Sequence, residues 1–155
     1  MKTRAFQEEP YFKGNHCFGC APDHPLELRI QSYWDDDESV CTWQPGKEHT
    51  AGWPGVMYGG TLASLIDCHC TCTAIAAENE GKPPGMESRW FASVSLKVEY
   101  LKPTLVNKPV NLRARFIERS GRKAILSCSV FSEGVKCVRG EVVAVKVPAQ
   151  AGPAK

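Results

Sequence analysis

The chain has 155 residues, of which 43% are hydrophobic and 23% are charged, as in an ordinary single globular domain. Its formal net charge of +2, without a run of basic residues, argues against nucleic acid or a membrane surface as a partner. Because the N-terminus lacks an apolar targeting segment, we expect a cytoplasmic protein whose eight cysteines are reduced.

The first part of the chain is rich in Pro and Gly and contains little regular structure. These residues interrupt any periodicity in residues 1–25, which we expect to be irregular. Two strands are predicted next, at residues 26–34 and 39–43, joined by the acidic turn at 35–38. A Gly/Pro-rich loop over residues 45–60 then leads into the first long apolar segment.

That segment predicts a single helix at residues 61–79, ended by Gly81 and the prolines that follow it. The helix carries little charge on any side before Glu78, which indicates that it is buried nearly all round. Up to four strands are predicted after it, at residues 90–101, 110–118, 123–131 and 135–147. Short turns separate these strands, which indicates an antiparallel sheet.

One long buried helix and a meander of antiparallel strands predict an α+β fold. In this fold the curved antiparallel sheet wraps around the long central helix. We expect a single domain at residues 26–147, preceded by the irregular segment 1–25 and followed by a frayed tail at residues 148–155.

The start of the predicted helix carries the strongest functional signal. Gly59 and Gly60 open it, and Asp67 lies two turns inside an otherwise apolar sequence. Helix N-terminal amides that no side chain covers can bind anions, and glycine lets a substrate oxygen approach them closely. Burying a carboxylate costs free energy, so an Asp in this apolar sequence indicates a functional role. These features predict an enzyme active site; the alternative is that the glycines only shape a loop and Asp67 bonds a backbone amide.

Three motifs extend this interpretation. They are Gly55-Val56-Met57-Tyr58-Gly59-Gly60 followed by Asp67, the strand end Tyr100-Leu101-Lys102-Pro103, and Cys17-Phe18-Gly19-Cys20 near the N-terminus. Together they resemble the hotdog superfamily, specifically its acyl-coenzyme A thioesterases related to the phenylacetate-pathway enzyme. The resemblance covers roughly residues 17–147 and implies the hotdog fold. The family's motif histidine is Tyr58 here, a phenol that can donate a hydrogen bond but is a poor base at pH 7.

The resemblance also implies roles for individual residues. The Gly60 amide would polarise the thioester carbonyl, and Asp67 would act as general base or nucleophile. Ser93 matches a strand position where some relatives place a hydroxyl that orients water, and Tyr58 stands at the catalytic histidine position. The implied substrate-binding positions are Gly59, Thr61 and His49. Candidates for binding the coenzyme A phosphates are Arg89, Lys102 and Arg139.

Helix geometry adds a constraint on this site. Gly60 and Asp67 share a helix face but lie ~10 Å apart along the axis, at ~1.5 Å per residue. One carbonyl cannot easily touch both groups, whereas two antiparallel helices related by a two-fold axis would bring Gly60 of one chain near Asp67 of the other. The family's interface-sited active centre implies the same arrangement. We therefore expect a homodimer, with a dimer of dimers as a further option.

The cysteines and histidines raise the alternative of a metal site. Cys17 and Cys20, with His16 and His24 nearby, have the spacing of half a zinc site. No second pair at comparable spacing stands out, although Cys68 and Cys72 share a helix face. We therefore expect no metal and no cofactor. A thioredoxin-like redox role is also disfavoured, because no βαβ unit surrounds the pair.

The sequence thus predicts an acyl-CoA thioesterase that hydrolyses its substrate to a carboxylic acid and free coenzyme A. The runner-up is an inactive hotdog protein that binds acyl-CoA or fatty-acyl groups and has lost activity with the motif histidine. A third class is a structural or partner-binding hotdog with no ligand. A hydratase is disfavoured, since no Asp/His pair with hydratase spacing is evident.

Overall fold

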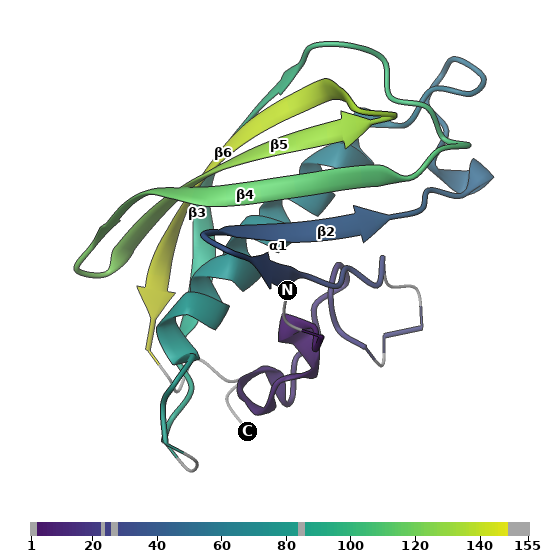
Figure 1. The fold of residues 1–155 in the computed structure, drawn as a ribbon. Helices are drawn as coiled ribbons and strands as arrows, with labels where there is room; N and C mark the ends of the chain where they lie inside the picture. Colours follow the sequence, from purple (N-terminus) through teal and green to yellow (C-terminus); the bar gives the residue numbers. More distant parts are fainter. Residues whose placement is uncertain (1–2, 23, 26–27, 84–85, 149–155) are drawn as a thin grey trace.

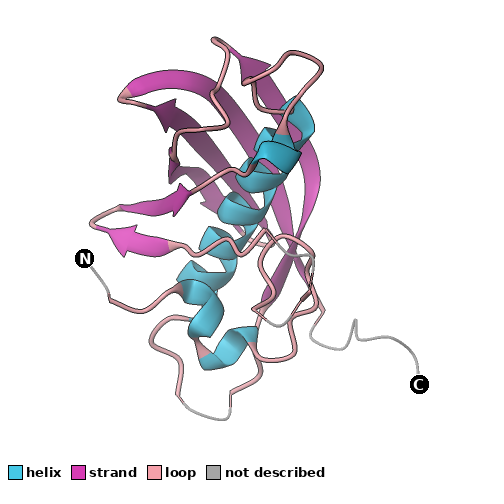
Figure 2. Cartoon of the chain, turned by 90° about the vertical axis from the view of Figure 1, so that its right-hand side faces the viewer, coloured by secondary structure: helices cyan, strands magenta, loops and turns pink. Residues whose placement is uncertain are grey.

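A long helix and a curved antiparallel sheet form the core of the computed structural model, which describes residues 3–22, 24–25, 28–83 and 86–148. Helix α1 (Gly59–Asn79) lies across the inner face of the sheet, and the sheet curls around it (Figures 1 and 2). This arrangement confirms the expected α+β fold, a central helix wrapped by a curved antiparallel sheet.

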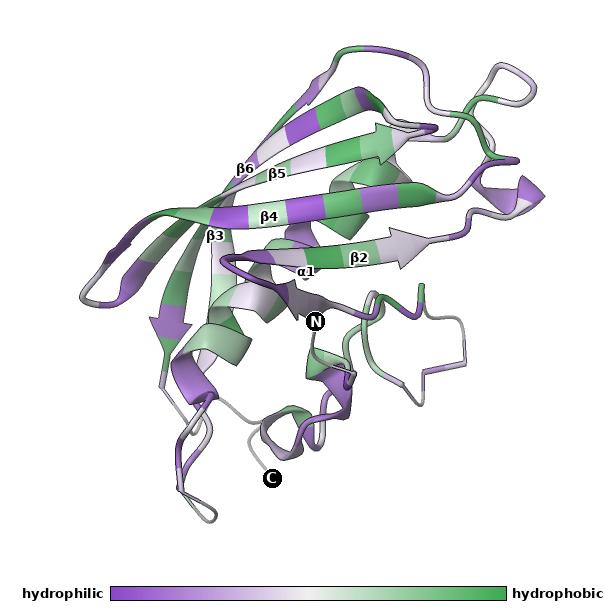
Figure 3. Cartoon of the chain, viewed as in Figure 1, coloured by the Kyte–Doolittle hydropathy of each residue, from purple (hydrophilic) through white to green (hydrophobic). Residues whose placement is uncertain are grey.

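The sheet has six strands in the order β1-β2-β4-β5-β6-β3, each antiparallel to its neighbours. Their bounds are β1 Tyr33–Asp35, β2 Glu38–Trp43, β3 Trp90–Tyr100, β4 Val110–Ser120, β5 Lys123–Ser132 and β6 Val135–Val147. Buried and exposed side chains alternate along β5 and much of β4, as in a sheet with one face on the core, and Figure 3 shows the alternation along β4. Strand β3 lies at one edge, beside β6.

The first strand is much shorter than predicted. The expected strand at residues 26–34 is reduced to β1, and residues 26–27 lie outside the described residues. The amides of Leu28 and Ile30 instead donate to the carbonyls of Phe18 and Gly19, at 3.2 and 3.1 Å. Arg29 between them has a φ of 53°, which an extended strand does not allow. Pairing with the N-terminal segment therefore replaces the expected strand.

Helix α1 is covered on almost every side, as predicted. It begins at Gly59, two residues earlier than expected, and among its residues only Ser64 is exposed. The sheet covers one side, and the N-terminal segment packs against another (Figure 1). Two short 3-10 helices, η1 (Phe6–Glu8) and η2 (Pro10–Phe12), place Phe6 and Phe12 in the same hydrophobic core. Among the described residues, no helix is long and apolar enough to cross a membrane.

A fully buried histidine joins α1 to the start of the sheet. His69 Nδ1 lies 2.8 Å from Ser32 Oγ, and its Nε2 lies 3.2 Å from both Oγ and the carbonyl oxygen of Ser39. Ser39 Oγ also bonds Thr73 Oγ1 at 2.6 Å. Burial lowers the pKa of His69 from 6.5 to about 4, so the ring is neutral in the folded protein.

His69 should make folding stability depend on pH. Between pH 6.5 and 4 the unfolded chain protonates this ring and the folded protein does not. Stability is therefore full above pH 6.5 and falls as the pH drops toward 4, by about 3 kcal/mol for this group. Urea unfolding across this range measures the slope, and His69→Asn is the comparison. The expectation is a flatter profile for His69→Asn; equal slopes in both proteins would contradict it.

Candidate active site

No side chain caps the N-terminus of α1. Tyr58 precedes the helix; its amide donates to the His49 carbonyl at 2.7 Å, and its carbonyl accepts amides of the next turn. Within the described residues, the amides of Gly59 and Gly60 donate no hydrogen bond. The positive end of the helix therefore presents two amides to any acceptor that approaches.

Two tyrosines flank this glycine pair. The Tyr100 hydroxyl donates to the Gly59 carbonyl at 2.7 Å, and the Tyr58 ring lies over Gly60. A Cβ atom at Gly60 would lie 2.4 Å from Tyr58 Cε1 and 2.9 Å from the hydroxyl oxygen, so glycine is what permits this approach. Burial, and then the nearby Tyr58, raise the pKa of Tyr100, which keeps its hydroxyl protonated at neutral pH.

His49 lies in the same region, where its ring is held by two contacts. Its Nδ1 accepts the Gly46 amide at 2.9 Å, and its ring packs edge-on against Trp43 with centroids 4.8 Å apart. A Glu48 carboxylate oxygen lies 3.8 Å from the same Nδ1, but an ion pair would need a proton there, which the amide bond excludes. The hydrogen-bond network therefore assigns the proton to Nε2, where it can be donated.

These groups line a groove of about 770 Å³ at the start of α1, a volume in the range of small-molecule sites. Its walls combine apolar surface with a few polar groups. The lining residues that matter here are Phe18, Trp43, His49, Tyr58, Gly60 and Thr61. The structure thus brings together most of the residues that the sequence assigned to the oxyanion and substrate-binding roles.

Asp67 lies nearly two turns farther along α1 and does not line this groove. Its Oδ1 atom is buried and has no hydrogen-bond partner in the described chain, and the same holds for Oγ1 of Thr71, one turn later. Leaving such an atom unpaired costs about 1–3 kcal/mol, so buried polar atoms are normally satisfied. Within one chain, the Gly60 amide and the Asp67 carboxylate, which were expected to act on one carbonyl, are therefore apart. The buried carboxylate oxygen still lacks a hydrogen-bond partner.

The structure places Ser93 on the edge strand β3. It is exposed, pairs with Ala144 of β6, and adjoins an irregularity of register between Ser93 and Ser95. Within the described residues, no hydrogen bond joins it to Asp67. The predicted water-orienting serine is thus not assembled with the carboxylate in a single chain.

The three basic residues suggested for the coenzyme A phosphates do not form one site in the chain. Arg89 lies beyond the C-terminal end of α1, where its backbone bonds Asn79. Lys102 follows β3, and Arg139 on β6 pairs with Glu99. None of the three lines the groove at Gly60.

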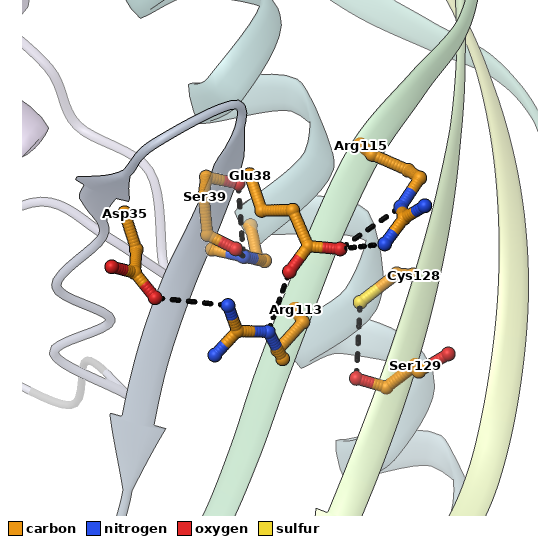
Figure 4. Close-up of polar contacts among 8 residues, drawn as sticks. Asp35, Glu38, Ser39, Arg113, Arg115, Cys128 and Ser129 are labelled. Atoms are coloured by element: carbon orange, nitrogen blue, oxygen red, sulfur yellow. Dashed lines mark hydrogen bonds and ion pairs between the residues drawn. The ribbon is translucent and has the colours of Figure 1, made fainter.

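A charged cluster on the outer face of the sheet was not singled out by the sequence (Figure 4). Arg113 contacts Glu38 at 2.6 Å and Asp35 at 2.9 Å, and Arg115 also contacts Glu38. The bond from Arg113 lowers the pKa of Glu38. Ser39, the next residue of β2, points the other way, toward α1. Because its charges pair with one another, this cluster ties β1, β2 and β4 together.

Cysteines from distant parts of the chain meet on α1. The Sγ atoms of Cys17, Cys20 and Cys68 all lie within 4.8 Å of one another, and in the described part of the chain this is the only group of three or more potential metal ligands. Sequence spacing could not reveal it, because packing of the N-terminal segment against the helix joins residues about fifty positions apart. The i, i+4 spacing of Cys68 and Cys72 was the available signal.

Comparisons with known proteins agree with this architecture. The sequence model of a family described as the Thioesterase superfamily matches residues 54–138, which contain the glycine pair and Asp67. A thioesterase superfamily protein from Shewanella loihica is 32% identical, with a TM-score of 0.66, over 87% of this chain and 96% of that one. The PaaI protein of E. coli, from the phenylacetic acid degradation operon, is 12% identical, covers 78% of this chain and 81% of that one, and has a TM-score of 0.65, which supports the hotdog fold alone.

Curated relatives are longer than this chain. Acyl-coenzyme A thioesterase THEM4 of Rattus norvegicus is 27% identical over 106 residues, which are 68% of this chain but 41% of that protein. The protein of the same name from Bos taurus is 27% identical over 110 residues, 69% of this chain and 39% of its own length. The chain thus spans about two fifths of the length of these two curated relatives.

Proposed function

Because this chain belongs to the Thioesterase superfamily, we propose that it hydrolyses an acyl-coenzyme A thioester to a carboxylic acid and free coenzyme A. The observation that carries the proposal is the pair of unsatisfied groups on α1: the Gly60 amide, which donates no hydrogen bond in the described chain, and the buried, unpartnered Oδ1 of Asp67. Thioester hydrolysis requires both kinds of group, a donor for the oxyanion and a carboxylate that activates the attack.

The proposed chemistry assigns each group one task. The substrate carbonyl oxygen accepts a hydrogen bond from the Gly60 amide, whose dipole stabilises the oxyanion as it forms. Asp67 either takes a proton from the attacking water or attacks the carbonyl carbon itself, forming an anhydride that water then cleaves. In both routes the carbon–sulfur bond breaks and the coenzyme A sulfur leaves with the electron pair and is protonated. Tyr58 and His49 lie where they can donate to the substrate, and Ser93 is proposed to orient the water.

The site is proposed to be shared between two copies of the chain. Gly60 and Asp67 lie ~10 Å apart on one helix, at ~1.5 Å per residue, so a single carbonyl cannot reach both in one chain. A two-fold axis that sets two α1 helices antiparallel brings Gly60 of one protomer to Asp67 of the partner subunit. Two equivalent sites per dimer follow.

Strand β3 supports this assembly. It is an 11-residue edge strand, and residues 92–97 are exposed. Val94 is 60% exposed and Leu96 39%. A long, apolar and unpaired edge is rarely left open to solvent, because its free backbone groups template pairing with another strand. We propose that β3 pairs with β3 of a second copy, and that two such dimers can associate further.

We propose that the protein works in the cytoplasm. The cytoplasm, a reducing compartment, suits a chain in which none of the eight cysteines forms a disulfide. We propose that the depth of the site beside α1 determines which acyl groups it accepts. Release of free coenzyme A thiol from short, long and aromatic acyl-CoAs measures this specificity.

Asp67→Asn should abolish hydrolysis, with a fall in kcat of at least about 10²-fold, because the amide is neither base nor nucleophile. Free-thiol release measures it, with the protein's own thiols subtracted in a substrate-free sample. Asp37→Asn, an exposed carboxylate in the β1–β2 turn, is the matched control and should retain full activity. An unchanged rate in Asp67→Asn would contradict the proposal; tight binding of acyl-CoA by the wild type without turnover would instead favour the inactive binding protein.

Mixed dimers test whether the site is shared. Gly60→Pro removes the amide hydrogen at a position where a helix tolerates proline, and Gly60→Ala keeps that hydrogen as the control for added bulk. Gly60→Pro and Asp67→Asn should each be inactive alone. Denatured together and refolded, they should recover about a quarter of the wild-type activity, since half of the dimers are mixed and each has one complete site. A folded, dimeric mixture that stays inactive would refute the shared site.

Tyr58 replaces the motif histidine, so its hydroxyl is the group to test. Tyr58→Phe should lower kcat/KM about tenfold, the loss expected for one hydrogen bond of ~1.4 kcal/mol. Tyr33→Phe removes a hydroxyl on β1, far along the chain from the groove, and should leave kcat/KM unchanged. Equal values for wild type and Tyr58→Phe would exclude the phenol from the reaction.

A further inference from the structure

Four cysteines from two parts of the chain converge beside α1. They are Cys17 and Cys20 of the N-terminal segment and Cys68 and Cys72 of α1. The Sγ atoms of Cys17 and Cys68 lie 3.6 Å apart, and those of Cys20 and Cys72 also lie 3.6 Å apart. Each residue of the loop pair thus contacts one residue of the helix pair. We call this group the four-cysteine cluster.

We propose that the four-cysteine cluster binds one zinc ion. A tetrahedral Zn²⁺ with Zn–S bonds of ~2.3 Å places its sulfur ligands about 3.8 Å apart. The two contacts of 3.6 Å match this spacing closely. Cys-x₂-Cys in a loop combined with two cysteines one helical turn apart supplies four thiolates from two rigid segments. This replaces the sequence expectation of no metal, which lacked a second ligand pair.

The same distances argue against the other uses of clustered cysteines. A disulfide needs its sulfurs ~2.05 Å apart, much closer than 3.6 Å. An iron–sulfur cluster has several atoms at its centre and holds its cysteines farther apart than a single ion does. Three sulfurs within 4.8 Å of one another leave room for one ion only.

Hydrogen bonds to the sulfurs distinguish this group from thiols that merely pack together. Asn15 Nδ2 donates to Cys20 Sγ at 3.2 Å, and the Gly19 amide donates to Cys17 Sγ at 3.4 Å. The Asn15 side chain is itself fixed, because its Oδ1 accepts the Cys17 amide at 3.0 Å. Donors aimed at sulfur favour thiolates, and several neighbouring thiolates need a cation among them.

Backbone placement and access also suit an ion. A Cβ atom at Gly19 would lie 2.7 Å from Cys68 Sγ, so only glycine lets the loop pass this close to α1. Cys20 and Cys72 are buried, whereas Cys17 is exposed, which gives the metal a path from solvent. Three of the sulfurs, those of Cys17, Cys20 and Cys68, already lie within 4.8 Å of one another, and Cys72 contacts Cys20, so a small shift of Cys72 completes a set of four ligands.

With four protein ligands the zinc has no open position, so its role is structural. It fixes the N-terminal segment to α1 at Cys68, the residue after Asp67. It also holds Phe18, which lies between two ligands and lines the groove at Gly60. Removal of the metal should therefore loosen one wall of that groove, with KM rising more than kcat falls.

Metal analysis of the full chain, purified without a metal-binding tag, tests this proposal. We expect about one zinc per chain after dialysis, with tetrahedral thiolate bands when cobalt replaces it. Cys17→Ser and Cys72→Ser should retain less zinc and show a lower Tm. Cys137→Ser, a buried cysteine of β6 whose thiol donates to the Val135 carbonyl, is the matched control and should keep one zinc.

Three results would overturn the proposal. The first is a folded wild type that takes up no zinc on titration and has eight titratable thiols. The second is a disulfide within the cluster, found by mass spectrometry of unreduced protein. The third is a zinc content that Cys17→Ser and Cys72→Ser leave unchanged. Because zinc content and Tm are measured without substrate, none of these results depends on thioesterase activity.

Discussion

The rigid spacing of Gly60 and Asp67 along one helix constrains every function of this chain. A helix rises ~1.5 Å per residue, so the backbone positions of Gly60 and Asp67 stay ~10 Å apart along the helix axis. Loop movement cannot close this distance, because both groups belong to the same packed helix. A second copy of α1 can supply the missing group, and the proposed site follows from that requirement.

The packing around α1 explains why the helix cannot bend or unwind to bring Gly60 and Asp67 together. The sheet covers one side, and the N-terminal segment packs against another. The His69 network joins the middle of the helix to β2 and to residue 32, with both ring nitrogens in hydrogen bonds. Unsatisfied groups on or beside this helix, within the described residues, include its first amides, the buried oxygens of Asp67 and Thr71, and the free edge of β3. Dimerisation through β3 would engage the last of these and place a second helix near the others.

The sequence predicted the parts of the fold that depend on local pattern. The uncharged run after Gly60 identified the buried helix, and short turns identified the antiparallel strands within two residues of their ends. The strand expected at residues 26–34 was wrong, because long-range pairing with Phe18 and Gly19 outweighs a local preference for extended structure. Tyr58, His49 and Gly60, which the sequence assigned to one site, all line the groove at the start of α1.

The rest depends on contacts between distant segments, which periodicity does not encode. The four-cysteine cluster required knowing that residues 17–20 lie on α1, and the Glu38–Arg113–Arg115 cluster required the pairing of β2 with β4. The sequence identified Asp67 because burying a carboxylate costs free energy. Only the structure shows that its Oδ1 atom is buried without a hydrogen-bond partner in the described chain.

The most direct test of the shared site is a crystal structure of Asp67→Asn bound to a non-hydrolysable acyl-CoA analogue that keeps the carbonyl. We predict that the carbonyl oxygen lies within hydrogen-bond distance of the Gly60 amide of one protomer, with the position 67 side chain of the partner subunit beside the carbonyl carbon. A carbonyl held between Gly60 and position 67 of the same chain, or an analogue bound away from the start of α1, would contradict it.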